Sequence, residues 1–83
     1  MLMLSGDVLY GDVLIRTVGN HQIEIENLRG IFHYDENKIV VQGKRQWVII
    51  CGRNLVVVTY TNCLMRLSGE IRVIEFRMEE GCE

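Results

Sequence analysis

The stretch "IEIENLRGIFHYDENKIVVQGKRQWVIICGRN" (residues 23–54) decides the fold of this chain. Apolar and polar residues alternate along much of it, as they do in strands whose two faces meet different surroundings. The runs are interrupted at NLRG, DENK, GKRQ and GRN, which are rich in residues typical of turns. No nucleophile stands beside a base, and no metal-ligand spacing occurs. The stretch therefore predicts strands and tight turns and gives no sign of a reaction centre.

Runs of strand length continue on both sides of this stretch. The chain contains no proline and no alanine, and β-branched residues dominate its short runs. We predict an all-β fold, a meander or roll of about eight short, mainly antiparallel strands that forms a partly open barrel or a sandwich. Residues 1–83 are expected to form a single domain, with frayed ends at 1–6 and 79–83. The predicted strands are 12–18, 21–28, 30–35, 38–43, 46–51, 54–60, 63–68 and 70–78.

The alternation predicts which side chains face the interior. Ile23 and Ile25 should point one way, and Gln22, Glu24 and Glu26 the other.

Two central runs, WVIIC (47–51) and LVVVTY (55–60), are apolar on both faces, as strands covered on both sides are. A chain of 83 residues buries only roughly 60–65% of its unfolded surface, so a single flat sheet can hardly cover both faces of a strand. Either the chain rolls up on itself or one face is buried against another subunit, which is the first indication of self-association.

The overall charge argues against a general electrostatic grip on nucleic acid. Nine basic and eleven acidic side chains leave a net charge of −2, whereas such proteins carry clustered positive charge. The start, "MLMLSGDVLYGD", matches neither a signal peptide nor a transit peptide. No stretch approaches the roughly 20 apolar residues that span a bilayer. The sequence therefore predicts a soluble chain unless a partner tethers it.

The cysteines do not resemble a disulfide framework. Cys51, Cys63 and Cys82 are odd in number and irregular in spacing, which favours reduced thiols in a cytosolic-type compartment. One intramolecular pair is the alternative. Cys51 ends an apolar run with no visible base nearby, so a buried structural cysteine is the expectation there.

The other candidate chemical groups have simpler explanations. His21 and His33 lie twelve residues apart, with no second ligand at a zinc spacing. Glu24 and Glu26, roughly 7 Å apart by strand spacing, fit a solvated strand face better than a pair of catalytic carboxylates. The sequence predicts no enzyme, no metal site and no cofactor.

The basic cluster GKRQW (43–47) is where a nucleic-acid contact would lie. Lys44 and Arg45, with Arg53 nearby, can bind phosphate, and Trp47 can stack on a base, as in single-strand binders. The acidic total and the hairpin position of the cluster count against that reading. An anchoring role for Trp47 in the core or in an interface is favoured instead.

Three segments together carry a family resemblance: IENLRGI (25–31), KIVVQGKRQWVIICGRNLVV (38–57) and LSGEIRVIEF (67–76). They resemble the YabP/YqfC family of bacterial sporulation proteins, and the similarity covers about residues 7–77. Trp47, where a smaller aliphatic residue is usual, and the three cysteines depart from that pattern and leave the subgroup open. The matching positions are Glu26, Asn27, Arg29, Gly30, Gly43, Gly52, Arg53, Gly69 and Ile71.

The resemblance implies a small, non-enzymatic protein made during sporulation and needed for the spore envelope, its cortex and coat. It also implies a membrane-protein partner, and so a place in the mother-cell cytoplasm at the forespore membrane. Asn27, Arg29 and Gly30 are expected to hold a tight turn, because Asn side chains bond the local backbone and Gly tolerates positive φ. A role of Arg29 as a contact for an acidic group is the alternative.

Two hypotheses of function remain open at this point. The first is a scaffold that self-associates or binds a membrane protein through uncovered β faces or edges. The second is a monomeric module that binds a small ligand or nucleic acid through Lys44, Arg45, Trp47 and Arg53.

Overall fold

The computed structural model describes residues 12–78 and confirms the all-β prediction, since these residues form strands and turns only. The predicted frayed ends, 1–6 and 79–83, lie outside the described residues. Within residues 12–78 no helix is long and apolar enough to cross a membrane. The strands are β1 (Leu14–Val18), β2 (Gln22–Glu26), β3 (Gly30–Tyr34), β4 (Lys38–Gln42), β5 (Gln46–Tyr60) and β6 (Leu64–Met78).

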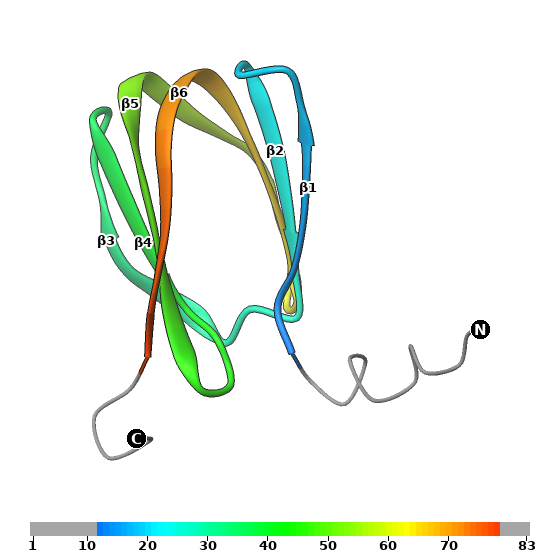
Figure 1. Ribbon diagram of the computed structural model, residues 1–83. Coiled ribbons are helices and arrows are strands. Elements are labelled where there is room, and N and C mark those ends of the chain that lie inside the picture. Colours follow the sequence, from blue (N-terminus) through cyan, green and yellow to red (C-terminus); the bar gives the residue numbers. More distant parts are fainter. Residues whose placement is uncertain (1–11, 79–83) are drawn as a thin grey trace, which may run out of the picture.

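All six strands belong to one antiparallel sheet, in the order β1-β2-β6-β5-β4-β3. The sheet is folded over on itself, so that β5 and β6 arch from one side of the molecule to the other (Figure 1). We call the first layer β1, β2 and the adjoining halves of β6 (64–68) and β5 (56–60). The second layer consists of β3, β4 and the remaining halves of β5 (46–51) and β6 (71–78).

Residues 12–78 form six strands where the sequence suggested about eight, because two expected turns are bends inside long strands. The cluster GRN (52–54) and the glycine at 69 were expected to separate strands, but β5 and β6 each run through them for 15 residues. The register between the two strands shifts at Cys51/Gly52 and again between Arg53 and Val56. Such bulges add local twist and bend a strand without ending it.

The bend brings the two backbones closer than side chains would allow. A Cβ on Gly52 would collide with the carbonyl oxygen of Glu70, and one on Gly69 would lie 2.6 Å from that of Asn54. Gly69 has a φ of +138° and Asn54 one of +56°, values that L residues with bulky side chains rarely adopt. The fold therefore requires glycine at both crossing points.

Two hairpin turns satisfy the backbone groups that the bend leaves unpaired. The turn between β3 and β4 accepts hydrogen bonds from Gly52 N (3.0 Å, to Asn37 O) and from Leu55 N (2.9 Å, to Glu36 O). The turn between β1 and β2 accepts a hydrogen bond from Ile71 N (2.7 Å, to Asn20 O). Unpaired backbone groups away from water are costly, so these turns hold both strands at the bend.

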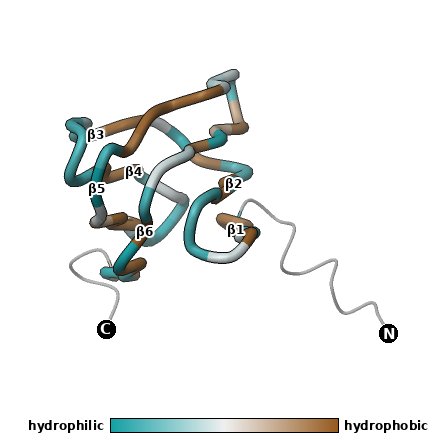
Figure 2. Tube along the Cα trace, turned by 90° about the horizontal axis from the view of Figure 1, so that it is seen from above, coloured by the Kyte–Doolittle hydropathy of each residue, from teal (hydrophilic) through white to brown (hydrophobic). Residues whose placement is uncertain are grey.

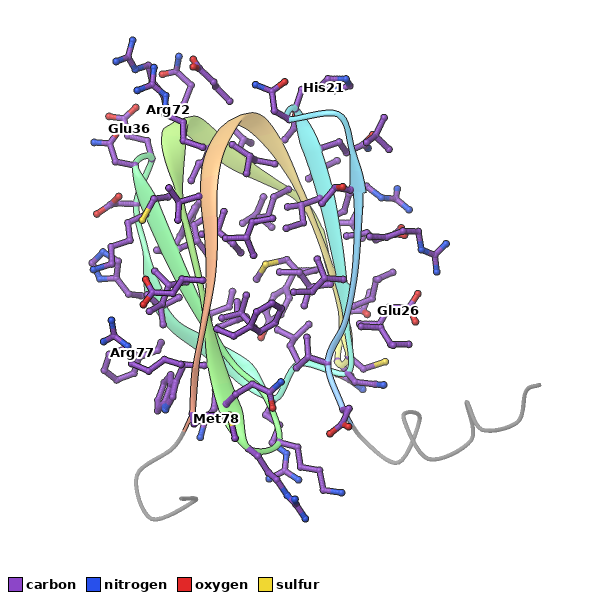
Figure 3. The ribbon with its side chains drawn as sticks, in the orientation of Figure 1. His21, Glu26, Glu36, Arg72, Arg77 and Met78 are labelled. Atoms are coloured by element: carbon purple, nitrogen blue, oxygen red, sulfur yellow. The ribbon has the colours of Figure 1, made fainter. Side chains whose placement is uncertain are left out.

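The core lies between the two layers (Figure 3) and is built from inward-facing aliphatic side chains. Viewed from above, hydrophobic and hydrophilic stretches alternate along the trace (Figure 2). Ile23 and Ile25 are fully buried, whereas Gln22, Glu24 and Glu26 are half-buried on the opposite face, which confirms the predicted alternation. The core cluster comprises Ile23, Ile25, Leu28, Ile39, Val41, Val48, Ile50, Leu55, Met65, Leu67 and Ile71.

We predict that Gly52→Ala lowers the free energy of unfolding by about 1–3 kcal/mol or more, since the added methyl group overpacks the strand crossing. Urea unfolding followed by circular dichroism measures the loss. Gly30→Ala is the control. No atom lies within 4 Å of a Cβ at Gly30, so its effect should stay within about 0.5 kcal/mol. Equal effects of the two substitutions would contradict the role assigned to the bend.

Candidate functional site

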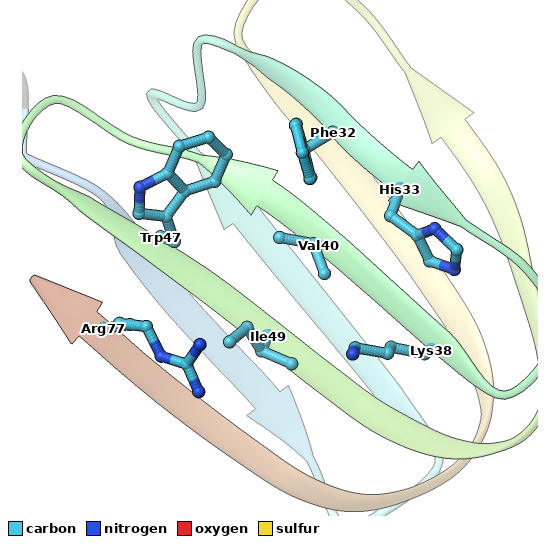
Figure 4. Close-up of a pocket in the computed structure, with 7 residues that line it drawn as sticks. All are labelled: Phe32, His33, Lys38, Val40, Trp47, Ile49 and Arg77. Carbon is cyan, nitrogen blue, oxygen red and sulfur yellow. The ribbon is translucent and has the colours of Figure 1, made fainter. Parts of the chain in front are cut away.

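The outer side of the second layer carries an open hollow of about 340 Å³ (Figure 4), which we call the outer hollow. Its side chains come from all four strands of that layer. Most of the lining is apolar, and three of the lining residues have basic side chains. The lining residues are Phe32, His33, Lys38, Val40, Trp47, Ile49 and Arg77.

A bulge in β3 shapes one wall of the outer hollow. Ile31 pairs with Val41, but the next pair is His33 with Val40, so Phe32 is the extra residue. In a regular strand Phe32 and His33 would point to opposite faces. Both line the outer hollow here, which is the redirection that a bulge produces. The ring of Phe32 meets that of Trp47 edge-on, with centroids 5.0 Å apart, a favourable aromatic arrangement.

The floor of the outer hollow is buried although it faces away from the core. Val40 and Ile49 pair across β4 and β5 and are only 8% and 7% exposed. Neither belongs to the core cluster between the layers. Phe32, by contrast, is 72% exposed. An apolar floor beside an exposed aromatic ring is typical of a surface that meets a partner.

Basic groups stand around this apolar floor. Lys38 and Arg77 line the outer hollow on opposite sides of Ile49 (Figure 4). Arg77 also forms an exposed ion pair with Glu75, with Nη2 and Oε2 3.2 Å apart. His33 Nε2 lies 2.9 Å from Asp35 Oδ2. That hydrogen bond, followed by those that Asp35 accepts from the backbone of the turn, lowers the pKa of the Asp35 carboxyl.

The outer face of the first layer has a different character. Arg16, Glu24 and Arg66 lie opposite one another on β1, β2 and β6. Arg66 donates to Glu24 Oε2 from Nη2 (2.6 Å) and from Nε (3.2 Å), and Arg16 Nε lies 3.9 Å from Glu24 Oε1. The hydrogen bond from Arg66 is the main reason that the pKa of Glu24 is lowered. Hence the charged ladder of Arg16, Glu24 and Arg66 lies on the outer face of the first layer, whereas the apolar floor of Val40 and Ile49 lies on that of the second.

The predicted basic patch does not form one site. Lys44 and Arg45 lie in the β4–β5 hairpin, whose turn is confirmed by the bond from Gly43 N to Gln46 O (2.7 Å). Arg53 lies at the bend of β5, six residues beyond Trp47, which is roughly 20 Å of strand. Among these residues only Trp47 lines the outer hollow. Its half-buried place against Phe32 is a surface position and not a core one.

The sequence reasoning missed most of the outer hollow. Lys38 and Val40 are two residues apart, as are Trp47 and Ile49, and residues two apart in a strand lie on the same face. The sequence could therefore have predicted that each of these pairs shares a face. It could not have predicted Phe32, which depends on a bulge, or Arg77, which depends on which strand pairs with β5.

The segment around Asn27 connects the two layers and is not a tight turn between neighbouring strands. Asn27, not Gly30, has the positive φ, of 67°. Its Nδ2 donates to Asp12 O at 2.9 Å, and its backbone N donates to Cys63 O at 2.7 Å. Arg29 is exposed, and its backbone N donates to Gln42 O. Asn27 makes the left-handed step, which its short polar side chain tolerates, so glycine's tolerance of positive φ is not used at Gly30.

The remaining candidate groups are scattered. Cys51 is half-buried instead of buried and Cys63 is exposed, and both are free thiols. Cys82 lies outside the described residues. Across residues 12–78 no three His, Cys, Asp or Glu side chains form a group that could hold a metal ion.

Comparison with known proteins identifies the family. The model of the YabP family matches residues 13–83, nearly the whole chain. The chain belongs to the YabP family. This confirms the resemblance found in the sequence, and it places the chain in a family associated with sporulation. No curated protein and no solved structure matches the chain. The family match carries no site residues, so the outer hollow rests on the geometry alone.

We predict that the lowered pKa of Glu24 makes the free energy of unfolding decrease at acidic pH. A carboxyl whose pKa is lowered by folding stabilises the protein above its ordinary value of 4.5, and that stability is lost as the pH falls through the lowered value. Glu24→Gln should therefore be less stable than the parent at pH 7 and should equal it at low pH. Thermal unfolding across this pH range measures the difference. Glu36→Gln, at an exposed turn residue, is the control and should leave the stability at pH 7 within about 0.5 kcal/mol of the parent's.

Proposed function

We propose that this chain is a non-enzymatic scaffold in the assembly of the spore envelope, its cortex and coat. It acts in the mother-cell cytoplasm by binding a membrane protein at the forespore membrane and by self-association. Membership of the YabP family supports the link with sporulation. The observation that carries the binding role is the outer hollow, because a monomer gains nothing from leaving Phe32 72% exposed beside a ready-made apolar floor.

The chemistry of the outer hollow indicates the kind of partner segment it would hold. An apolar side chain can rest on Val40 and Ile49 and pack against the edge-to-face pair of Phe32 and Trp47. Carboxylates on the same segment would meet Lys38 and Arg77 at the rim. We therefore expect a segment with an apolar anchor and acidic neighbours, since buried aromatic contacts supply affinity and rim charges supply orientation.

A substitution in the wall of the outer hollow tests this function in an endospore-forming host. Phe32→Glu places a carboxylate on the apolar surface, and loss of an anchor of this kind costs binding about 2 kcal/mol or more. The strain should give fewer heat-resistant spores, with an incomplete cortex or coat in electron micrographs. A fluorescent fusion should lose its position around the forespore.

The control for Phe32→Glu is Val18→Glu. Val18 is also an exposed apolar residue, at 54%, but it lies on the first layer. Both variants should keep the parent's thermal unfolding temperature, because exposed positions tolerate such changes. Normal spores from the Phe32→Glu strain would refute a role of the outer hollow in envelope assembly. Equal defects in both strains would refute it as well.

The alternative is a monomeric module for a small ligand or nucleic acid. The observation in its favour is that two aromatic rings, of Phe32 and Trp47, lie beside Lys38 and Arg77, the combination that single-strand binders use. Salt-dependent retention on an oligonucleotide that is lost in Lys38→Glu would favour this alternative. Retention lost only in Lys44→Glu/Arg45→Glu would instead move the contact to the β4–β5 hairpin.

A further inference from the structure

Folding the sheet into two layers leaves unpaired strand edges, and they differ in regularity. Within residues 12–78, β3 is interrupted by its bulge, and the half of β5 in the first layer has a register shift between Val57 and Thr59. β1 is only five residues long. The half of β6 in the second layer pairs with β5 without any shift from Val73 to Met78. Bulges obstruct pairing with another chain, whereas a regular edge permits it.

Among the residues that the structure describes, this part of β6 has a neighbouring strand on one side only. β5 is its partner there, and no Cα atom of β1 lies within 8 Å of a Cα atom of β6. The hydrogen bond from Ile71 N to Asn20 O occupies the edge at the bend, so the free edge begins after Ile71. Half of the backbone groups beyond that point are directed away from β5, which is the arrangement a further strand can pair with.

Apolar side chains on both faces of the same edge are uncovered. Val73 on the outer face is 50% exposed, while Phe76 and Met78 on the inner face are 54% and 59% exposed. Exposed apolar side chains along a regular free edge are the features that strand addition uses.

We propose that β6 pairs antiparallel with β6 of a second copy of this chain, about a two-fold axis at Phe76. The proposal deepens the self-associating scaffold proposed above by naming the edge and the register through which two copies meet. The order of charges along β6 indicates that the added strand is β6 of a second copy. Opposite charges directly across an antiparallel pair stabilise it and like charges destabilise it, and two copies of β6 can place opposite charges across from each other.

The register follows from three residues on β6. With the axis at Phe76, Glu75 lies opposite the partner's Arg77 and Arg77 opposite the partner's Glu75. The two Phe76 rings then meet across the axis, and Ile74 meets the partner's Met78. An axis at Glu75 would set two carboxylates against each other. An axis at Ile74 would place Glu75 opposite the partner's Val73 and Arg77 opposite the partner's Ile71, so that neither charge would meet an opposite one. The same-chain pair of Glu75 and Arg77, at 3.2 Å, becomes part of a group of four charges.

The geometry of this pair also concerns the outer hollow. An axis perpendicular to the sheet keeps the outer faces of both copies on the same side. Arg77 lies at the free edge and lines the outer hollow (Figures 3 and 4). The paired copies therefore present two outer hollows on one continuous face, with the charged group of four between them. A partner with two binding segments would gain affinity from that arrangement.

A charge-reversal series tests the register. Light scattering on the full chain in reducing buffer, from micromolar to millimolar, should show the mass rising from 9.6 kDa toward twice that value. Glu75→Arg and Arg77→Glu each set like charges opposite one another. Each should raise the concentration of half-association roughly tenfold or more. The double variant Glu75→Arg/Arg77→Glu restores opposite charges across the axis and should recover the parent's association.

Two controls carry matched charge changes away from this edge. Arg45→Glu in the β4–β5 hairpin and Glu36→Arg in the β3–β4 turn are at exposed positions and should leave the mass curve unchanged. A constant mass of 9.6 kDa for the parent would overturn the proposal. The proposal would also be overturned if the single charge reversals left association unchanged, or if the double variant did not recover the parent's association. Phe32→Glu should associate as the parent does. The spore assay therefore tests the outer hollow, and the mass assay tests the pairing of β6, independently of each other.

Discussion

The close crossing of β5 and β6 at Gly52 and Gly69 is the constraint on which the rest of the structure depends. Two strands of 15 residues can bend together only where no Cβ stands between their backbones. Once bent, they supply strands to both layers, and the space between the layers becomes the core. The hairpin turns at 19–21 and 35–37 then bond to the exposed backbone of the bend. Local turns far apart in the chain thus depend on the same two glycines.

The bend also determines that the molecule has two outer faces of different chemistry. Across the first layer, Arg16, Glu24 and Arg66 form a charged ladder that gains from contact with water. Across the second layer, Val40 and Ile49 are buried and line the outer hollow together with the aromatic pair of Phe32 and Trp47. The binding role proposed above places the partner on the second layer, where the outer hollow lies.

Arg77 belongs to both of the surfaces on which the proposals above depend. It lines the outer hollow, and it lies on the free edge of β6 next to Met78. Copies that pair through this edge would bring their outer hollows together on one side. For a member of the YabP family, a small domain that presents surfaces in a fixed array is a coherent role, and it needs no reaction centre.

The sequence by itself determined the all-β class, the inward-facing residues of β2, the turns at DENK and GKRQ, and the family. These features depend on residues close together in the chain: side chains alternate with a period of two, and Asp, Asn and Gly favour turns locally. Only the tertiary structure decided that GRN is a bend within a strand, since Gly52 is required by the backbone of Glu70. The same holds for the outer hollow, which joins Phe32, Trp47 and Arg77 from three strands through a bulge and a register that no local pattern specifies.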